Sequence, residues 1–139
     1  MSLVQQLEGR TDGVFRWIGG GDPELDALRA GWRFVLLDST GADERHPFLE
    51  ACAEAFDLPR RVVESWEGLD LCLRGLDLDE PAGLLVLWQG WQSLAESDPD
   101  AFDCALEVFR DACVAWDDDE IPGAVLLVGD GPETDLPEV

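Results

Sequence analysis

Residues 83–88 read GLLVLW, an uninterrupted apolar run of strand length near the middle of the chain. Two further runs have the same character, FVLL at residues 34–37 and AVLLV at residues 124–128. Continuous apolar runs of about four to eight residues predict strands that are buried on both faces, as the strands of parallel sheets are. The sequence therefore predicts three such strands.

Helical patterns separate these three strands. Apolar side chains recur at helical spacing over Pro47–Asp57, Trp66–Leu76 and Pro99–Trp116, and a short helical piece is expected at Trp91–Ala95. Because strands alternate with helices, the sequence predicts an α/β fold with a small three-stranded parallel sheet flanked by helices.

The N-terminal region carries a weaker strand signal. Val14–Ile18 is a short run of apolar, basic and aromatic residues that glycines end, and it is a candidate for an extra edge strand. Asp22 and Pro23 then supply the N-cap and first turn of a short helix that ends near Ala30.

Length and composition limit the organisation of the chain. Its 139 residues fit one domain, since domains typically hold about 100–150 residues. We expect a single domain over residues 1–139, with an N-terminal extension (1–31), a core (32–128) and a flexible acidic tail (129–139). The start lacks a signal-peptide pattern and the four cysteines form no CxxC pair, so we expect a cytoplasmic protein with reduced thiols.

The charge of the chain argues against two classes of partner. Nine arginines, no lysine and 31 acidic residues give a formal net charge of −22. Nucleic acids and anionic membranes both require cationic patches, so we expect neither as a partner. A basic protein partner, a need for solubility and a salt-adapted host are all compatible with this charge.

Signals for an enzyme or a metal site are weak. Without lysine there is no Walker A motif, and no GxGxxG fingerprint follows a strand. His46 is the only histidine, and the cysteines lie among apolar helical residues, where thiols are usually inert. The acidic run Asp117–Glu120 lacks the alternating ligands and central glycine of a calcium-binding loop. We therefore expect no catalytic residue, no metal site and no cofactor.

The helix expected at Trp66–Leu76 has an informative outer face. At about 100° per residue its apolar side chains gather on one side, and Leu71 falls nearly opposite them. Leu71 lies between Glu67 and Arg74, a mixed apolar and charged surface that suits contact with a partner. On the long helix that follows, Asp111 points outward in the same way.

The stretch of residues 48–76, FLEACAEAFDLPRRVVESWEGLDLCLRGL, resembles the barstar family of intracellular inhibitors of barnase-type ribonucleases. Leu58-Pro59 matches the end of the family's first apolar helix. Ser65–Leu69 is a conservative version of its Asn-Trp-Asp-Ala-Leu motif, and Cys72-Leu73 matches the Cys-Leu that follows. The elements downstream keep the family's order, so the resemblance covers about residues 32–128 and implies a barstar-like fold.

The resemblance also implies how such a protein acts. Members of the family occupy the ribonuclease active site with acidic side chains of one helix and its preceding loop, in place of substrate phosphates. Carried over by position, the partner-binding residues implied for this chain are Arg61, Val62, Glu67, Asp70, Leu71, Arg74, Leu76 and Asp111.

This sequence departs from the family's pattern at several of these positions. Leu71 stands where the family has the dominant acid of the helix, and Arg61 and Val62 replace an aromatic pair in the loop. Arg74 adds positive charge where the cationic cleft of a ribonuclease would be repelled.

These observations favour a protein-binding module over an enzyme. We expect a barstar-like inhibitor or immunity protein that blocks the active site of an intracellular or co-produced ribonuclease or toxin, sterically and electrostatically, through a diverged interface. The alternative is a non-inhibitory interaction or scaffold protein that retains the fold. The oligomeric state stays open.

Overall fold

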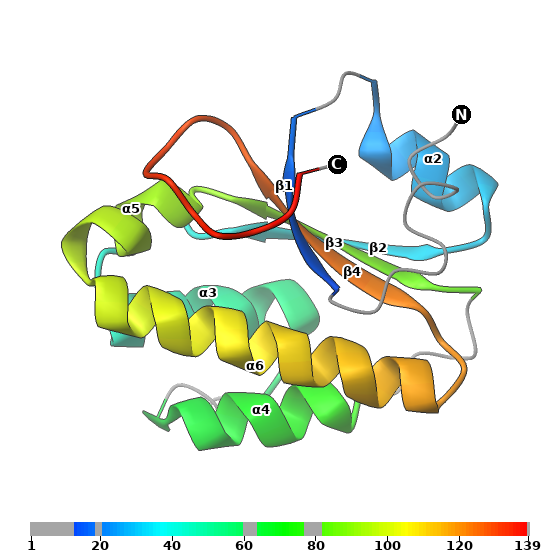
Figure 1. The fold of residues 1–139 in the computed structure, drawn as a ribbon. Coiled ribbons are helices and arrows are strands. Elements are labelled where there is room, and N and C mark those ends of the chain that lie inside the picture. Colours follow the sequence, from blue (N-terminus) through cyan, green and yellow to red (C-terminus); the bar gives the residue numbers. More distant parts are fainter. Residues whose placement is uncertain (1–12, 19–20, 60–63, 77–81, 139) are drawn as a thin grey trace.

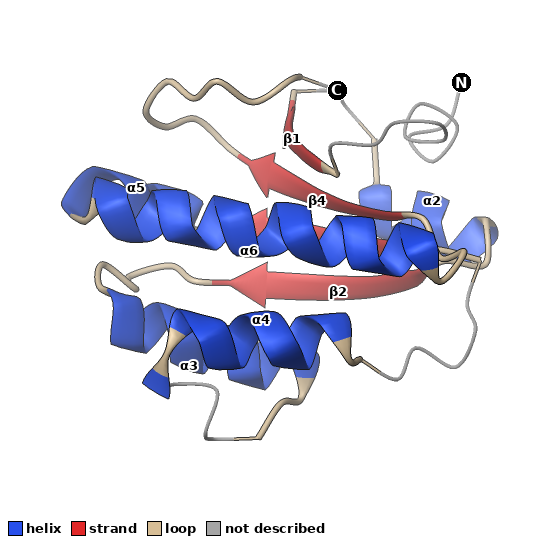
Figure 2. Ribbon diagram, turned by 60° about the horizontal axis from the view of Figure 1, so that its bottom comes forward, coloured by secondary structure: helices blue, strands red, loops and turns tan. Residues whose placement is uncertain are grey.

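A four-stranded parallel sheet forms the centre of the molecule. The computed structural model describes residues 13–18, 21–59, 64–76 and 82–138. The strand order is β1-β4-β3-β2, and the arrows of β2 and β4 point the same way in Figure 2. The predicted α/β class and parallel sheet are confirmed, and the candidate N-terminal strand is the fourth strand, at one edge. The strands are β1 (Val14–Trp17), β2 (Arg33–Asp38), β3 (Leu84–Gln89) and β4 (Gly123–Val128).

Helices cover the two faces of the sheet unequally. Four of the described helices lie on one side of the sheet, where α4 packs on α6 and α3, and only the short α2 packs on the other side (Figure 1). Among the described residues, no helix combines the length and the apolar character needed to cross a membrane. The helices are α2 (Pro23–Arg29), α3 (Arg45–Phe56), α4 (Trp66–Arg74), α5 (Trp91–Ser97) and α6 (Pro99–Asp118).

The strand β2 differs from the expectation that it is buried on both faces. Its side chains alternate, with Val35 and Leu37 buried and Leu36 49% exposed. The cause is its place at a sheet edge, where Leu36 lies on the face that α2 covers only in part. The central strands β3 and β4 do have continuous buried runs, as predicted.

The larger core lies between the sheet and the four helices, and Trp88 lies at its centre. The Trp88 ring is 5.2 Å from the Phe48 ring of α3 and 5.3 Å from the Phe109 ring of α6, measured between centroids. Its Nε1 donates a hydrogen bond to Ser39 Oγ at 2.8 Å, so the one polar atom of this buried ring is satisfied. Trp88 thereby fixes α3 and α6 on the strand β3.

The C-terminal segment contacts the body of the fold at several points. Leu136 is buried, and the Arg16 backbone N–H of β1 donates to Pro137 O at 2.9 Å. Gln92 of α5 donates to Asp130 O at 2.7 Å. The expectation of a flexible tail did not include these anchor points, because they depend on residues distant in sequence.

Candidate functional site

The helix α4 presents the outer face that its sequence predicts. Ser65 caps it, since the Ser65 Oγ accepts a hydrogen bond from Gly68 N at 3.0 Å. Leu69 and Leu73 are fully buried against the core, whereas Leu71 is 64% exposed. The alternation of buried and exposed positions therefore directs Leu71 toward solvent.

The long helix α6 holds α4 in place. Trp116 Nε1 of α6 donates a buried hydrogen bond to Leu73 O of α4 at 2.9 Å. The two helices lie side by side and run in the same direction (Figure 1). Because an indole N–H and a buried carbonyl are both costly to leave unpaired, this bond fixes the spacing of the helices. Outward side chains of α4 and α6 consequently share one surface.

An arginine joins acidic residues of both helices on this surface. Arg74 Nε lies 2.9 Å from Asp70 Oδ1, one turn earlier on α4, and Arg74 Nη2 lies 3.7 Å from Asp111 Oδ2 on α6. Exposed ion pairs of this kind contribute about 0.2–1 kcal/mol each, so they orient the side chains more than they stabilise the fold. The structure thus brings together three of the residues expected at the binding site.

Two exposed apolar side chains accompany these charges. Besides Leu71, Val114 of α6 is 55% exposed, one turn beyond Asp111. Val114 was not expected as a site residue, although its spacing from Asp111 on a helix was available as a signal. Glu67, in the first turn of α4, is also exposed. We call this surface the α4–α6 face; it comprises Glu67, Asp70, Leu71, Arg74, Asp111 and Val114.

The remaining expected site residues lie elsewhere. Leu76 packs in part against the core, so it presents less surface than Leu71 does. Arg61 and Val62 lie outside the described residues.

The single histidine lies in an ion pair, and two of the four cysteines are buried in the core. His46 Nε2 lies 2.7 Å from Glu50 Oε1 on the exposed side of α3. Burial raises the pKa of the Cys113 thiol to about 12, and burial raises the pKa of Cys52 as well. Both thiols stay protonated at neutral pH, so neither is a nucleophile.

The fold and this face define a small acidic α/β protein whose exposed helical surface combines carboxylates with apolar side chains. The model of the barstar family, described as barnase inhibitor, matches residues 32–128. The chain belongs to the barstar family, and the resemblance noted in its sequence is confirmed. The family supports an inhibitory role and a ribonuclease as the kind of partner, and β1 and α2 lie outside the matched residues. Comparison with curated proteins gives no match.

Proposed function

We propose that this protein is a cytoplasmic inhibitor or immunity protein that blocks the active site of a ribonuclease or toxin with its α4–α6 face. Membership of the barstar family supports inhibition in general. The observation that carries the specific proposal is the position of Leu71, which is 64% exposed in the middle of the outer face of α4.

The chemistry of the face supports an interface with an apolar centre and a charged rim. Burying an exposed leucine side chain contributes about 1.5–3 kcal/mol, and interface centres are commonly apolar while their rims stay polar. Glu67, Asp70 and Asp111 supply carboxylates around Leu71. The net charge of −22 attracts a basic partner over long distances and accelerates its association.

The apolar centre also supports divergence from barnase-type partners. The resemblance places Leu71 where the family has the dominant acid of the helix, which faces a basic ribonuclease cleft. A leucine offers that cleft no compensating charge, and cationic groups that lose their water without gaining a partner weaken a complex. The proposed target therefore has a less basic and more apolar surface at the point of contact.

Restoring the acid tests this proposal. We expect Leu71→Asp to bind a catalytically inactive barnase-type ribonuclease at least tenfold more tightly than the wild type, as isothermal titration calorimetry measures. Leu28→Asp is the matched control, because Leu28 is 59% exposed on α2, across the sheet, and adds the same charge when substituted. Stoichiometric inhibition of the active form of that ribonuclease by the wild type would contradict the diverged interface. Equal effects of the two variants would contradict the α4–α6 face as the binding surface.

A second candidate function rests on a different surface. Leu36 of β2 and Leu25 and Leu28 of α2 are also exposed, and they lie on the side of the sheet opposite α4. These residues favour an interaction or scaffold protein that uses the α2 side. Loss of partner binding in Leu36→Asp, with unchanged binding in Leu71→Asp, would favour this candidate.

A further inference from the structure

We propose that Arg74 is a specificity-determining residue that selects against partners whose contact surface is purely cationic. The inference rests on the proposed function in one respect, since it assumes that the α4–α6 face is where a partner binds. Arg74 is the one cation among the six residues that define this face.

The guanidinium of Arg74 lies between two carboxylates from different helices. Its Nε is 2.9 Å from Asp70 Oδ1, and its Nη2 is 3.7 Å from Asp111 Oδ2. A cation from a partner would need these same oxygens. Arg74 therefore competes, from within the molecule, for the acceptors that an acidic inhibitory surface would offer.

The position of Arg74 makes this competition unavoidable for a partner that buries Leu71. The two residues are three positions apart on α4, so they are neighbours on the helix surface. The order of Asp70 before Arg74 is the favourable one for a pair four residues apart, and a cation in the last turn also suits the helix dipole. The ion pair with Asp70 and the helix dipole both hold the Arg74 guanidinium on the α4–α6 face.

Exposure keeps the effect moderate. The side chain of Arg74 is 48% exposed and that of Asp111 is 51% exposed, so water screens their attraction. A purely cationic partner must displace Arg74 from both carboxylates, and this cost lowers its affinity by about threefold to tenfold. A guanidinium has five N–H donors, so Arg74 retains donors for a partner's oxygen atoms. The favoured partner surface thus combines an apolar recess for Leu71 with neighbouring carboxylate or carbonyl oxygens for Arg74.

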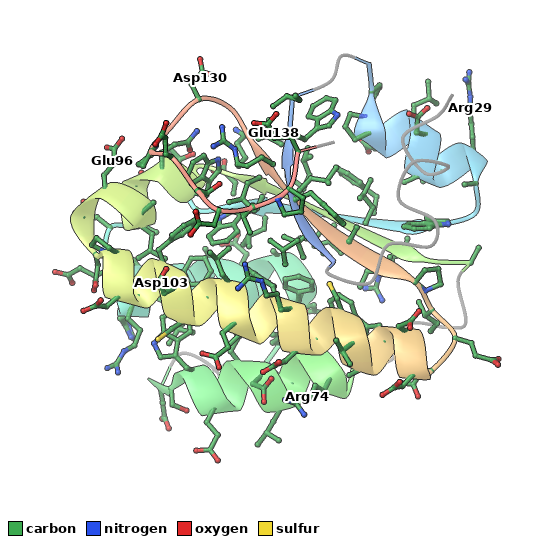
Figure 3. The ribbon with its side chains drawn as sticks, in the orientation of Figure 1. Arg29, Arg74, Glu96, Asp103, Asp130 and Glu138 are labelled. Atoms are coloured by element: carbon green, nitrogen blue, oxygen red, sulfur yellow. The ribbon has the colours of Figure 1, made fainter. Side chains whose placement is uncertain are left out.

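A cationic peptide tests the competition without any natural partner. Titrating hexa-arginine into the labelled protein and following backbone amides of α4 and α6 by NMR gives a dissociation constant for this face. We expect Arg74→Gln to tighten that constant by about threefold to tenfold at low salt. Arg29→Gln is the matched control, because it removes the same charge from the opposite side of the molecule (Figure 3). Equal effects of the two variants would overturn the proposal.

A ribonuclease separates this inference from the proposed function. In the Leu71→Asp background, we expect Arg74→Gln to increase affinity for the inactive barnase-type ribonuclease by the same factor, and high salt to remove the increase. If the peptide result holds and the ribonuclease does not bind, the role of Arg74 stands and the proposed function fails. If the ribonuclease binds and Arg74→Gln behaves like Arg29→Gln, the role of Arg74 is overturned and the proposed function stands.

Discussion

Gly90, between β3 and α5, is a residue whose identity the backbone dictates. Its φ is +79°, and a Cβ at this position would lie 2.3 Å from Thr40 N. Thr40 has little room to move, because its N and its Oγ1 both donate to Asp38 Oδ1, at 3.0 and 2.6 Å. The same hydrogen bonds lower the pKa of Asp38 below its usual value. Two chain segments therefore meet at a distance that only glycine permits.

The variant Gly90→Ala tests this close approach. We expect it to lower the free energy of unfolding by about 3 kcal/mol, since the left-handed conformation costs about 1–2 kcal/mol and the steric overlap adds more. Urea denaturation followed by tryptophan fluorescence measures the change.

The control for this prediction is Gly41→Ala. Gly41 has a similar φ of +83°, but nothing lies within 4 Å of its Cβ position. We expect Gly41→Ala to lower the free energy of unfolding only by the cost of the left-handed conformation, about 1 kcal/mol. Equal losses in the two variants would show that the contact with Thr40 contributes nothing.

Single residues of the candidate site differ in how far their sequence context revealed them. The helical period alone predicted that Leu71 faces outward, and its 64% exposure confirms this. The sequence also marked Arg74 as an unfavourable charge for a cationic partner. Its contact with Asp111 could not be predicted, because an ion pair between two helices depends on how the helices pack.

At the scale of elements, the nine-residue helix α4 depends on its cap and on its neighbours. Helices this short are marginal in isolation, so tertiary contacts carry most of their stability. Here Leu69 and Leu73 supply the buried side, and the Ser65 hydroxyl satisfies an N–H of the first turn. The helix that carries the proposed interface is consequently sensitive to a single hydroxyl.

We expect Ser65→Ala to lower the free energy of unfolding by about 1 kcal/mol, the usual cost of losing an N-cap. Hydrogen exchange of the α4 amides should accelerate more than exchange in β3 and β4. Ser97→Ala serves as the control, because Ser97 is exposed at the end of α5. Uniform acceleration across the sheet would indicate global destabilisation and contradict a local capping role.

Elements were predictable where local pattern decides them. The strands β3 and β4 and the helix α6 follow directly from apolar runs and helical spacing. The one-sided burial of β2 could not be predicted, because the apolar run FVLL is compatible with an edge strand and with a central strand alike. Strand order is likewise a property of the whole fold, which no single segment encodes.

At the scale of the whole molecule, β1 and α2 lie outside the family match yet contribute to a second core. Phe15 of β1 and Ala27 of α2 are fully or almost fully buried there, beside Leu126 of β4. The sheet face that they cover would otherwise meet water. We infer that β1 and α2 belong to the same folding unit as the part that matches the family.

Truncation tests this inference. We expect a fragment of residues 32–139 to lose several kcal/mol of stability and to associate, because it exposes Leu126 and the unpaired edge of β4. Circular dichroism with urea and light scattering measure both effects. Since such a fragment could simply fail to fold, Phe15→Ala in the full chain is the second variant, with an expected loss of about 3–5 kcal/mol. If the fragment and Phe15→Ala were both as stable as the wild type, the N-terminal extension would not be part of the folding unit.

The pairing of β1 with β4 has a consequence for biosynthesis. The segments that it joins are far apart in the chain, as the hydrogen bond from Arg16 to Gly129 O across 113 residues shows. At about 5–20 residues per second, roughly 6–23 seconds separate the translation of these two partners. Throughout that interval the nascent strand carries Phe15 without its native neighbour, so ribosome-associated chaperones are expected to shield it. Any condition that slows elongation lengthens this exposure.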